Sequence, residues 1–155
     1  MRTAILVSVV AGALALSACG GSQEEQFTMS DGEAIRRLDG DFVKAFNAKD
    51  LAKILTMYTD NSVLMPPNAP ALKGREPLKP FYNEMFGRGA VDLKMEPGDV
   101  GGHGPLGFQN GTYTLVTGDT RDRGKFLLVM RKMAGNWKFE HSIWSSDLPP
   151  TVPPK

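Results

Sequence analysis

Apolar residues recur at helical spacing in three segments of the chain, which predict helices over 31–47, 51–58 and 74–87. Ser30 opens an S-x-x-E sequence, the spacing of a capping box, at the start of the first segment. Asp50 is expected to cap the second helix, because a carboxylate there accepts a hydrogen bond from a free backbone N–H. The pattern therefore predicts three helices, each with one apolar face.

The other apolar segments predict β-strands. A short strand over 62–65 ends at two prolines, which cannot continue a strand ladder. Alternating apolar and polar residues predict four more strands over 91–102, 106–117, 125–133 and 137–145, separated by glycine-containing turns. Helices followed by a run of hairpin strands predict an α+β fold, a cone of three helices packed on a strongly curved, mainly antiparallel sheet.

The first 18 residues have the features of a secretory signal peptide: a positive Arg2, an uncharged apolar stretch and then small residues. The sequence Leu16-Ser17-Ala18-Cys19 resembles the bacterial lipoprotein signal, which implies that Cys19 is acylated and becomes the first mature residue. By the same resemblance, Gly20 in place of an aspartate implies an outer-membrane anchor facing the periplasm if the source is a diderm bacterium. The alternative is an ordinary signal peptide with an incidental thiol.

These features divide the chain into four parts. A signal peptide over 1–18 is followed by the lipidated cysteine and a flexible polar tether over 19–29. The folded domain is expected over 30–148 and a proline-rich tail over 149–155.

Charge and cysteine content exclude several classes of protein. The chain has 18 Lys and Arg against 17 Asp and Glu, a net charge of +1, so it lacks the basic surface of a nucleic-acid-binding protein. Its single cysteine cannot form an intrachain disulfide. We therefore expect no nucleic-acid partner, and a lipid bilayer as partner through acylated Cys19.

Several short segments fall in an order that resembles the SnoaL-like branch of the nuclear-transport-factor-2-like superfamily. They are residues 46–50, 58–67, 72–76, 111–113, 124–126, 137–139 and 144–149. The resemblance covers nearly all of 31–149 and extends to ketosteroid-isomerase-like proteins and calmodulin-dependent-kinase association domains. It implies a cystatin-like cone that opens at one end on an apolar pocket, and commonly a homodimer. Some members of the family are isomerase-like or cyclase-like enzymes, and others only bind, scaffold or oligomerise.

Isomerase chemistry needs a carboxylate base and a Tyr or protonated Asp that stabilises the oxyanion. By the resemblance, the base position is Met65, which cannot take a proton. The helix-one tyrosine is replaced by Phe42, and the donor aspartate falls in the apolar segment 127–130. The residues of the ketosteroid isomerase are thus absent.

Two other residues remain as weak candidates for catalysis. His141 is in phase with Trp137, Phe139 and Ile143, so it is predicted to face inward, as a general acid or base or simply as a hydrogen-bonded core histidine. Asp147 ends the last strand, where a structural role is the alternative to catalysis. Trp144 is out of phase with Trp137, which implies either a bulge or two covered faces.

No motif for a cofactor or metal is present. The two histidines are far apart and the cysteine lies in the lipoprotein signal, so they make no metal cluster. No phosphate-binding loop or nucleophile elbow occurs. The sequence predicts neither a cofactor nor a metal.

The strongest positive signal is apolar. Residues predicted to line a pocket in the cone are Phe42, Phe46, Tyr58, Met65, Tyr82, Phe86, Tyr113, Met130, His141 and Trp144. The leading hypothesis is an anchored lipoprotein that binds a small apolar molecule without catalysis. The alternatives are a dimerisation or protein-interaction module, and an isomerase-, cyclase- or hydrolase-like enzyme that uses His141 or Asp147.

Overall fold

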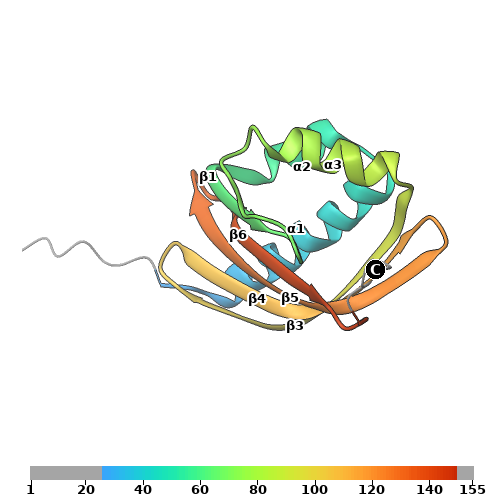
Figure 1. Cartoon of the computed structure of the whole chain (residues 1–155). Helices are drawn as coiled ribbons and strands as arrows, with labels where there is room; N and C mark the ends of the chain where they lie inside the picture. The colour runs from blue at the N-terminus through green and yellow to red at the C-terminus, as the bar shows by residue number, and fades with distance from the viewer. Residues whose placement is uncertain (1–25, 150–155) are drawn as a thin grey trace, which may run out of the picture.

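The computed structural model describes residues 26–149 and places three helices against one face of a curved sheet (Figure 1). The helices are α1 (Met29–Asn47), α2 (Leu51–Thr56) and α3 (Leu78–Gly87). The strands are β1 (Tyr58–Met65), β2 (Leu72–Lys73), β3 (Ala90–His103), β4 (Leu106–Thr117), β5 (Thr120–Met133) and β6 (Asn136–Ser146). The signal peptide 1–18 and Cys19 lie outside the described residues.

The strands form one sheet in the order β2-β1-β6-β5-β4-β3. Consecutive strands from β3 to β6 pair antiparallel as hairpins, whereas β1 pairs with β6 in parallel. The predicted α+β fold and mainly antiparallel sheet are confirmed. Within residues 26–149, none of the helices is both long and apolar enough to cross a bilayer.

Some elements begin or end at other residues than those predicted. The second helix ends at Thr56, and β1 begins at Tyr58 instead of residue 62. The two-residue strand β2 occupies part of the predicted loop. Between β4 and β5 the predicted loop over 118–124 is a tight turn, because Thr120 already pairs with Thr117.

Helix α1 begins two residues earlier than expected, with Thr28 and not Ser30 at the N-cap. The Thr28 hydroxyl accepts a bond from the Asp31 backbone N–H, and the Asp31 carboxylate accepts one from the Thr28 backbone N–H at 2.9 Å. This carboxylate also accepts a bond of 3.1 Å from the Trp137 indole and lies 3.2 Å from the Lys132 ammonium. The bond from the Thr28 hydroxyl, with those from Trp137 and Lys132, lowers the pKa of Asp31 well below its usual range. The start of α1 is thereby joined to β5 and β6.

A bulge in β6 changes which side chains face the interior. Met130 on β5 pairs with Phe139, and the next residue back, Val129, pairs with His141, so Glu140 is an extra residue in β6. Trp137 and Phe139 are buried before the bulge, and Ser142 is buried after it. Because the side-chain period of a strand is two, one extra residue exchanges the inward and outward positions. The bulge that the phase of Trp144 suggested is confirmed.

Candidate functional site

An apolar cavity lies between the C-terminal half of α1, α3 and the concave face of the sheet. The space that water-sized molecules can occupy in it is about 90 Å³. Its lining residues are Phe42, Phe46, Tyr58, Leu64, Phe81, Tyr82, Met85, Leu93, Met95, Tyr113, Leu115, Phe126, Leu128, Phe139, Ser142, Ile143 and Trp144. Phe81, Met85 and Trp144 are only partly buried, so they mark the side on which the cavity approaches solvent.

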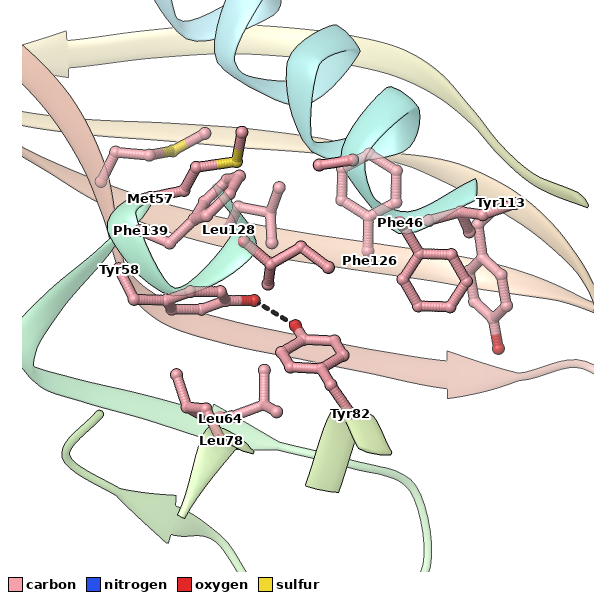
Figure 2. Packing of buried hydrophobic residues seen from close by; sticks show 14 of the residues in the cluster. Phe46, Met57, Tyr58, Leu64, Leu78, Tyr82, Tyr113, Phe126, Leu128 and Phe139 are labelled. Carbon is pink, nitrogen blue, oxygen red and sulfur yellow. Dashed lines mark hydrogen bonds between the residues drawn. The ribbon is translucent and has the colours of Figure 1, made fainter. Parts of the chain in front are cut away.

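Two tyrosine hydroxyls meet in this otherwise apolar wall (Figure 2). The Tyr58 and Tyr82 oxygens are 2.6 Å apart, and both residues are buried. Burial raises the pKa of Tyr58 to about 12 and that of Tyr82 well above its ordinary value. Both phenols are therefore neutral near neutral pH, and two hydroxyls that share one hydrogen bond keep one further proton to donate.

Six of the ten predicted pocket residues line the cavity. They are Phe42, Phe46, Tyr58, Tyr82, Tyr113 and Trp144. Their rings make edge-on or tilted contacts, such as Phe42 against Phe139 with centroids 5.5 Å apart. The helical faces and the aromatic residues of the strands therefore indicated much of the wall.

The other four predicted residues lie elsewhere. Met65 is on the opposite face of β1 from Leu64, which takes its place in the wall. Phe86 packs against Phe46, at 5.1 Å between ring centroids, outside the cavity lining. Met130 is fully buried in the core, where it pairs with Phe139.

His141, the fourth, is exposed on the outer face of the sheet, contrary to the inward orientation predicted for it. The bulge at Glu140 is the physical reason, because it puts His141 out of phase with Phe139. Asp147 is also exposed, and its carboxylate pairs with the Lys125 ammonium. Neither candidate catalytic residue faces the cavity.

Eleven of the lining residues and one buried acid were not predicted from the sequence. The missed lining residues are Leu64, Phe81, Met85, Leu93, Met95, Leu115, Phe126, Leu128, Phe139, Ser142 and Ile143. Strand alternation could have found Leu93, Met95, Leu115, Phe126 and Leu128, which share the concave face with Tyr113. Ile143 is at the rim of the cavity, since it pairs with Leu127 and is exposed on the outer face.

The missed acid is Asp39, which is 1% exposed in the middle of α1. Neither of its carboxylate oxygens has a hydrogen-bond partner among the described residues. Burial raises its pKa to about 7, although the Arg36 charge acts in the opposite direction. Its spacing from Ile35 and Phe42, both on the inner face of α1, was the signal that could have placed it inside.

Metal binding finds no support in this part of the chain. Over residues 26–149, the His, Cys, Asp and Glu side chains form no group of three or more that could hold a metal ion. Apart from tyrosines, the cavity lining contains no ionisable side chain. The lining therefore offers apolar contact and hydrogen bonding.

The sequence of this domain matches a known protein family. The SnoaL-like domain model matches residues 40–139, which is more than half of the chain. The chain belongs to the SnoaL-like family. Among curated proteins, none matches this SnoaL-like chain.

Solved structures share the fold of this SnoaL-like domain. It is 24% identical to a ketosteroid isomerase-like protein from Erwinia carotovora atroseptica SCRI1043, over 79% of this chain and 100% of that one, with a TM-score of 0.70. A protein of unknown function with a cystatin-like fold from Nostoc punctiforme PCC 73102 is 19% identical over 83% and 98%, with a TM-score of 0.69. An NTF-2-like protein of unknown function from Shewanella oneidensis MR-1 is 17% identical over 72% and 96%, with a TM-score of 0.63. At these identities the likeness shows the fold alone.

The stability of this SnoaL-like domain should fall as the pH rises through the range in which Asp39 titrates. An unfolded aspartate titrates near pH ~3.9, so the folded protein, with Asp39 titrating at about 7, holds one more proton between these two values. We expect this group to lower the free energy of unfolding by about 1.4 kcal/mol per pH unit in that interval. Asp39→Asn should remove this slope.

Urea unfolding of both proteins at several values between about pH 4 and 8 measures the effect. Asp41→Asn, which removes an exposed carboxylate from the same helix, is the matched control and should keep the wild-type slope. Parallel profiles for the wild type and Asp39→Asn would show that Asp39 titrates normally.

Proposed function

We propose that this protein binds a small, predominantly apolar molecule in the cavity and does not transform it. The observation that carries the proposal is the cavity wall, which is aromatic and aliphatic except for Tyr58, Tyr82, Tyr113 and Ser142. Binding sites for small molecules are typically apolar hollows with a few polar groups that orient the ligand. The Tyr58–Tyr82 pair supplies such a group, because it keeps one proton to donate.

The size of the cavity limits the ligand. A hollow of about 150 Å³ holds benzene, whereas this one measures about 90 Å³. A single ring therefore enters only if side chains at the open side move. Met85 suits such movement, since methionine has an unbranched, flexible side chain.

The geometry favours binding over catalysis. His141 and Asp147, the residues expected to carry a reaction, are exposed on the outside of the sheet. The phenols of Tyr58 and Tyr82 are held neutral by their raised pKa values, which suits hydrogen bonding and not proton abstraction.

Filling the open side of the cavity should abolish binding. We expect Met85→Trp to reduce the affinity for toluene at least 10-fold, because the indole occupies the space that the ring of toluene needs. Titration of toluene into 15N-labelled protein, followed by NMR, gives both affinity and location. Native mass spectrometry of protein purified from its own cells should also show a co-purified small molecule.

Met133→Trp is the matched control, since Met133 is exposed outside the cavity, and it should bind toluene as the wild type does. Absence of any toluene-induced shift at cavity residues of the wild type, together with no co-purified molecule, contradicts the proposed function.

The proposed function includes a lipid anchor at Cys19, which lies outside the described residues. The support is the signal-like sequence that ends in Leu16-Ser17-Ala18-Cys19. Such an anchor places the domain in the cell envelope, and in the outer membrane facing the periplasm in a diderm bacterium.

Cys19→Ser should abolish incorporation of a fatty-acid analogue in cells that produce the protein, because serine offers no thiol for acylation. In-gel detection of the labelled protein band measures the incorporation. Ser22→Ala, a change beside the proposed anchor, should leave labelling intact. Labelling that persists in Cys19→Ser refutes acylation at this residue.

A second candidate function is self-association, which the outer face of the sheet favours. Phe108, Leu127 and Ile143 are each more than 40% exposed there. They are near neighbours, because Leu127 pairs with Ile143, and Phe108 pairs with Val129, two residues further along β5. Large exposed apolar side chains that gather in one patch are typical of association surfaces.

Leu127→Glu should convert a dimer into a monomer, because it buries a carboxylate in the apolar contact. Sedimentation velocity of the soluble domain without its lipid measures the mass. Met29→Glu, at an exposed methionine on α1, is the control and should stay dimeric. A wild-type domain that is monomeric at every accessible concentration excludes this second function.

A further inference from the structure

A group of buried polar side chains lies beside the inner end of the cavity, and neither the fold nor the proposed function so far uses it. Asp39 on α1 is 1% exposed, and Gln109 on β4 is fully buried. Both carboxylate oxygens of Asp39 and both amide atoms of Gln109 lack a hydrogen-bond partner among residues 26–149. Thr59, Ser62 and Ser142 also have hydroxyls that are unpartnered in this part of the chain, but Asp39 and Gln109 leave two unpartnered atoms each. Because an unpartnered buried polar group is destabilising, these two residues need an explanation.

The register of the sheet places Gln109 next to the cavity. Gln109 pairs with Leu128, and Leu128 pairs with Ser142, so the three side chains form one row across the concave face. Leu128 and Ser142 both line the cavity. Gln109 thus extends the cavity wall by one strand on the side of β4.

The helix places Asp39 at the same end. Asp39 is one helical turn before Phe42, and the Phe42 ring lines the cavity against Phe139 and Tyr82. One turn in the other direction, Ile35 lies against Gly107, two residues before Gln109 on the same face of β4. Asp39 is therefore held between the packed core around Ile35 and the aromatic wall around Phe42. Burial of Asp39 close enough for its charge to act on Tyr58 agrees with this placement.

The chemistry of these groups suits a ligand that can donate a hydrogen bond. An ionised Asp39 offers only acceptors, and the Gln109 amide offers both an acceptor oxygen and an NH2 donor. A hydroxyl can donate to Asp39 and accept from Gln109, and hydrogen bonds to a charged group are stronger than those between neutral groups. A ligand that brings a donor to this end would satisfy groups that the protein alone leaves unpartnered.

We propose that Asp39 and Gln109 form the polar inner end of the ligand site and receive a hydroxyl or amine on an otherwise apolar, ring-sized molecule. This inference rests on the proposed function, because it assigns the polar part of the same ligand. The apolar body lies among Phe42, Leu128 and Phe139, and its donor passes beside the Phe42 ring. Phe42 is partly exposed, and its ring contacts those of Phe46, Tyr82 and Phe139.

The experiment compares benzyl alcohol with toluene, which have nearly the same ring and differ in the hydroxyl donor. Both are titrated into the wild-type domain and followed by NMR. We expect benzyl alcohol to bind about 10-fold more tightly than toluene, after correction for their different hydration, and to shift the side-chain amide signals of Gln109. Benzylamine is the second probe, and it distinguishes an amine donor from a hydroxyl.

Asp39→Leu should remove the preference for benzyl alcohol while toluene still binds, because leucine keeps the volume and offers no acceptor. Asp39→Asn, which keeps one acceptor oxygen, should retain part of the preference for benzyl alcohol. Phe42→Ala opens the way to Asp39 and should raise the affinity for benzyl alcohol more than that for toluene. Asp41→Asn, on the exposed side of α1, serves as the control and leaves both affinities unchanged.

The outcomes separate the two proposals. If neither toluene nor benzyl alcohol binds and no molecule co-purifies, the proposed function fails. If toluene binds but benzyl alcohol gains no preference that depends on Asp39, the proposed function stands and the assignment of Asp39 and Gln109 is overturned. A preference that is lost equally in Asp39→Leu and Asp41→Asn also overturns it, because the effect then comes from overall charge.

Discussion

The extra residue at Glu140 determines which side chains of β6 face the interior. Without it, His141 would continue the row of Trp137 and Phe139, and an imidazole would lie among the aromatic rings. With it, Ser142 takes the inner position, opposite Leu128, and His141 turns outward beside Val63 and Val129. The ionic pair of Arg131 with Glu140, 2.5 Å apart, occupies the outer face at the bulge. One inserted residue thus makes the cavity wall uncharged along β6.

Features that depend on residues close together in the chain are predicted from the sequence, and features that depend on distant residues are not. The helices and hairpins depend on neighbouring residues, so spacing and turn residues locate them closely. The parallel pairing of β1 with β6 joins residues some eighty positions apart, and the start of β1 at Tyr58 depends on it. Periodicity in one strand cannot report a bulge defined by its partner, which is why His141 was assigned to the wrong face. Met65 was predicted to line the cavity and Leu64 does so instead, for the same reason. Of two adjacent apolar residues, either can face inward until the pairing of their strand is known.

Asp39 illustrates a different limit of sequence reasoning. A carboxylate in an amphipathic helix is normally a solvent-exposed residue, because burial of a charge is costly. Here the apolar face of α1 runs Ile35, Asp39, Phe42 and Phe46, and the acid interrupts it. Local rules fail most often where a protein sacrifices stability for function, so the place at which the helical pattern breaks is also the place at which a site is expected.

The cavity lies beneath a helix that is attached to the sheet near both of its ends. A Cβ on Gly107 would lie 2.6 Å from the Ile35 side chain, and a Cβ on Gly32 would lie 3.4 Å from Val100. The absence of a side chain at Gly107 lets the N-terminal half of α1 approach the sheet, whereas the Gly32 distance is an ordinary contact, and the bonds of Asp31 to Thr28 and Trp137 secure this end of the helix. The C-terminal end of α1 is attached to the sheet as well, because the Asn47 amide donates to the Leu93 carbonyl at 2.9 Å and accepts from the Leu93 N–H at 2.8 Å. Between the two attachments the sheet curves away from the helix, and the rings of Phe42 and Phe46 fill only part of the space that remains, so the hollow depends on both ends of α1.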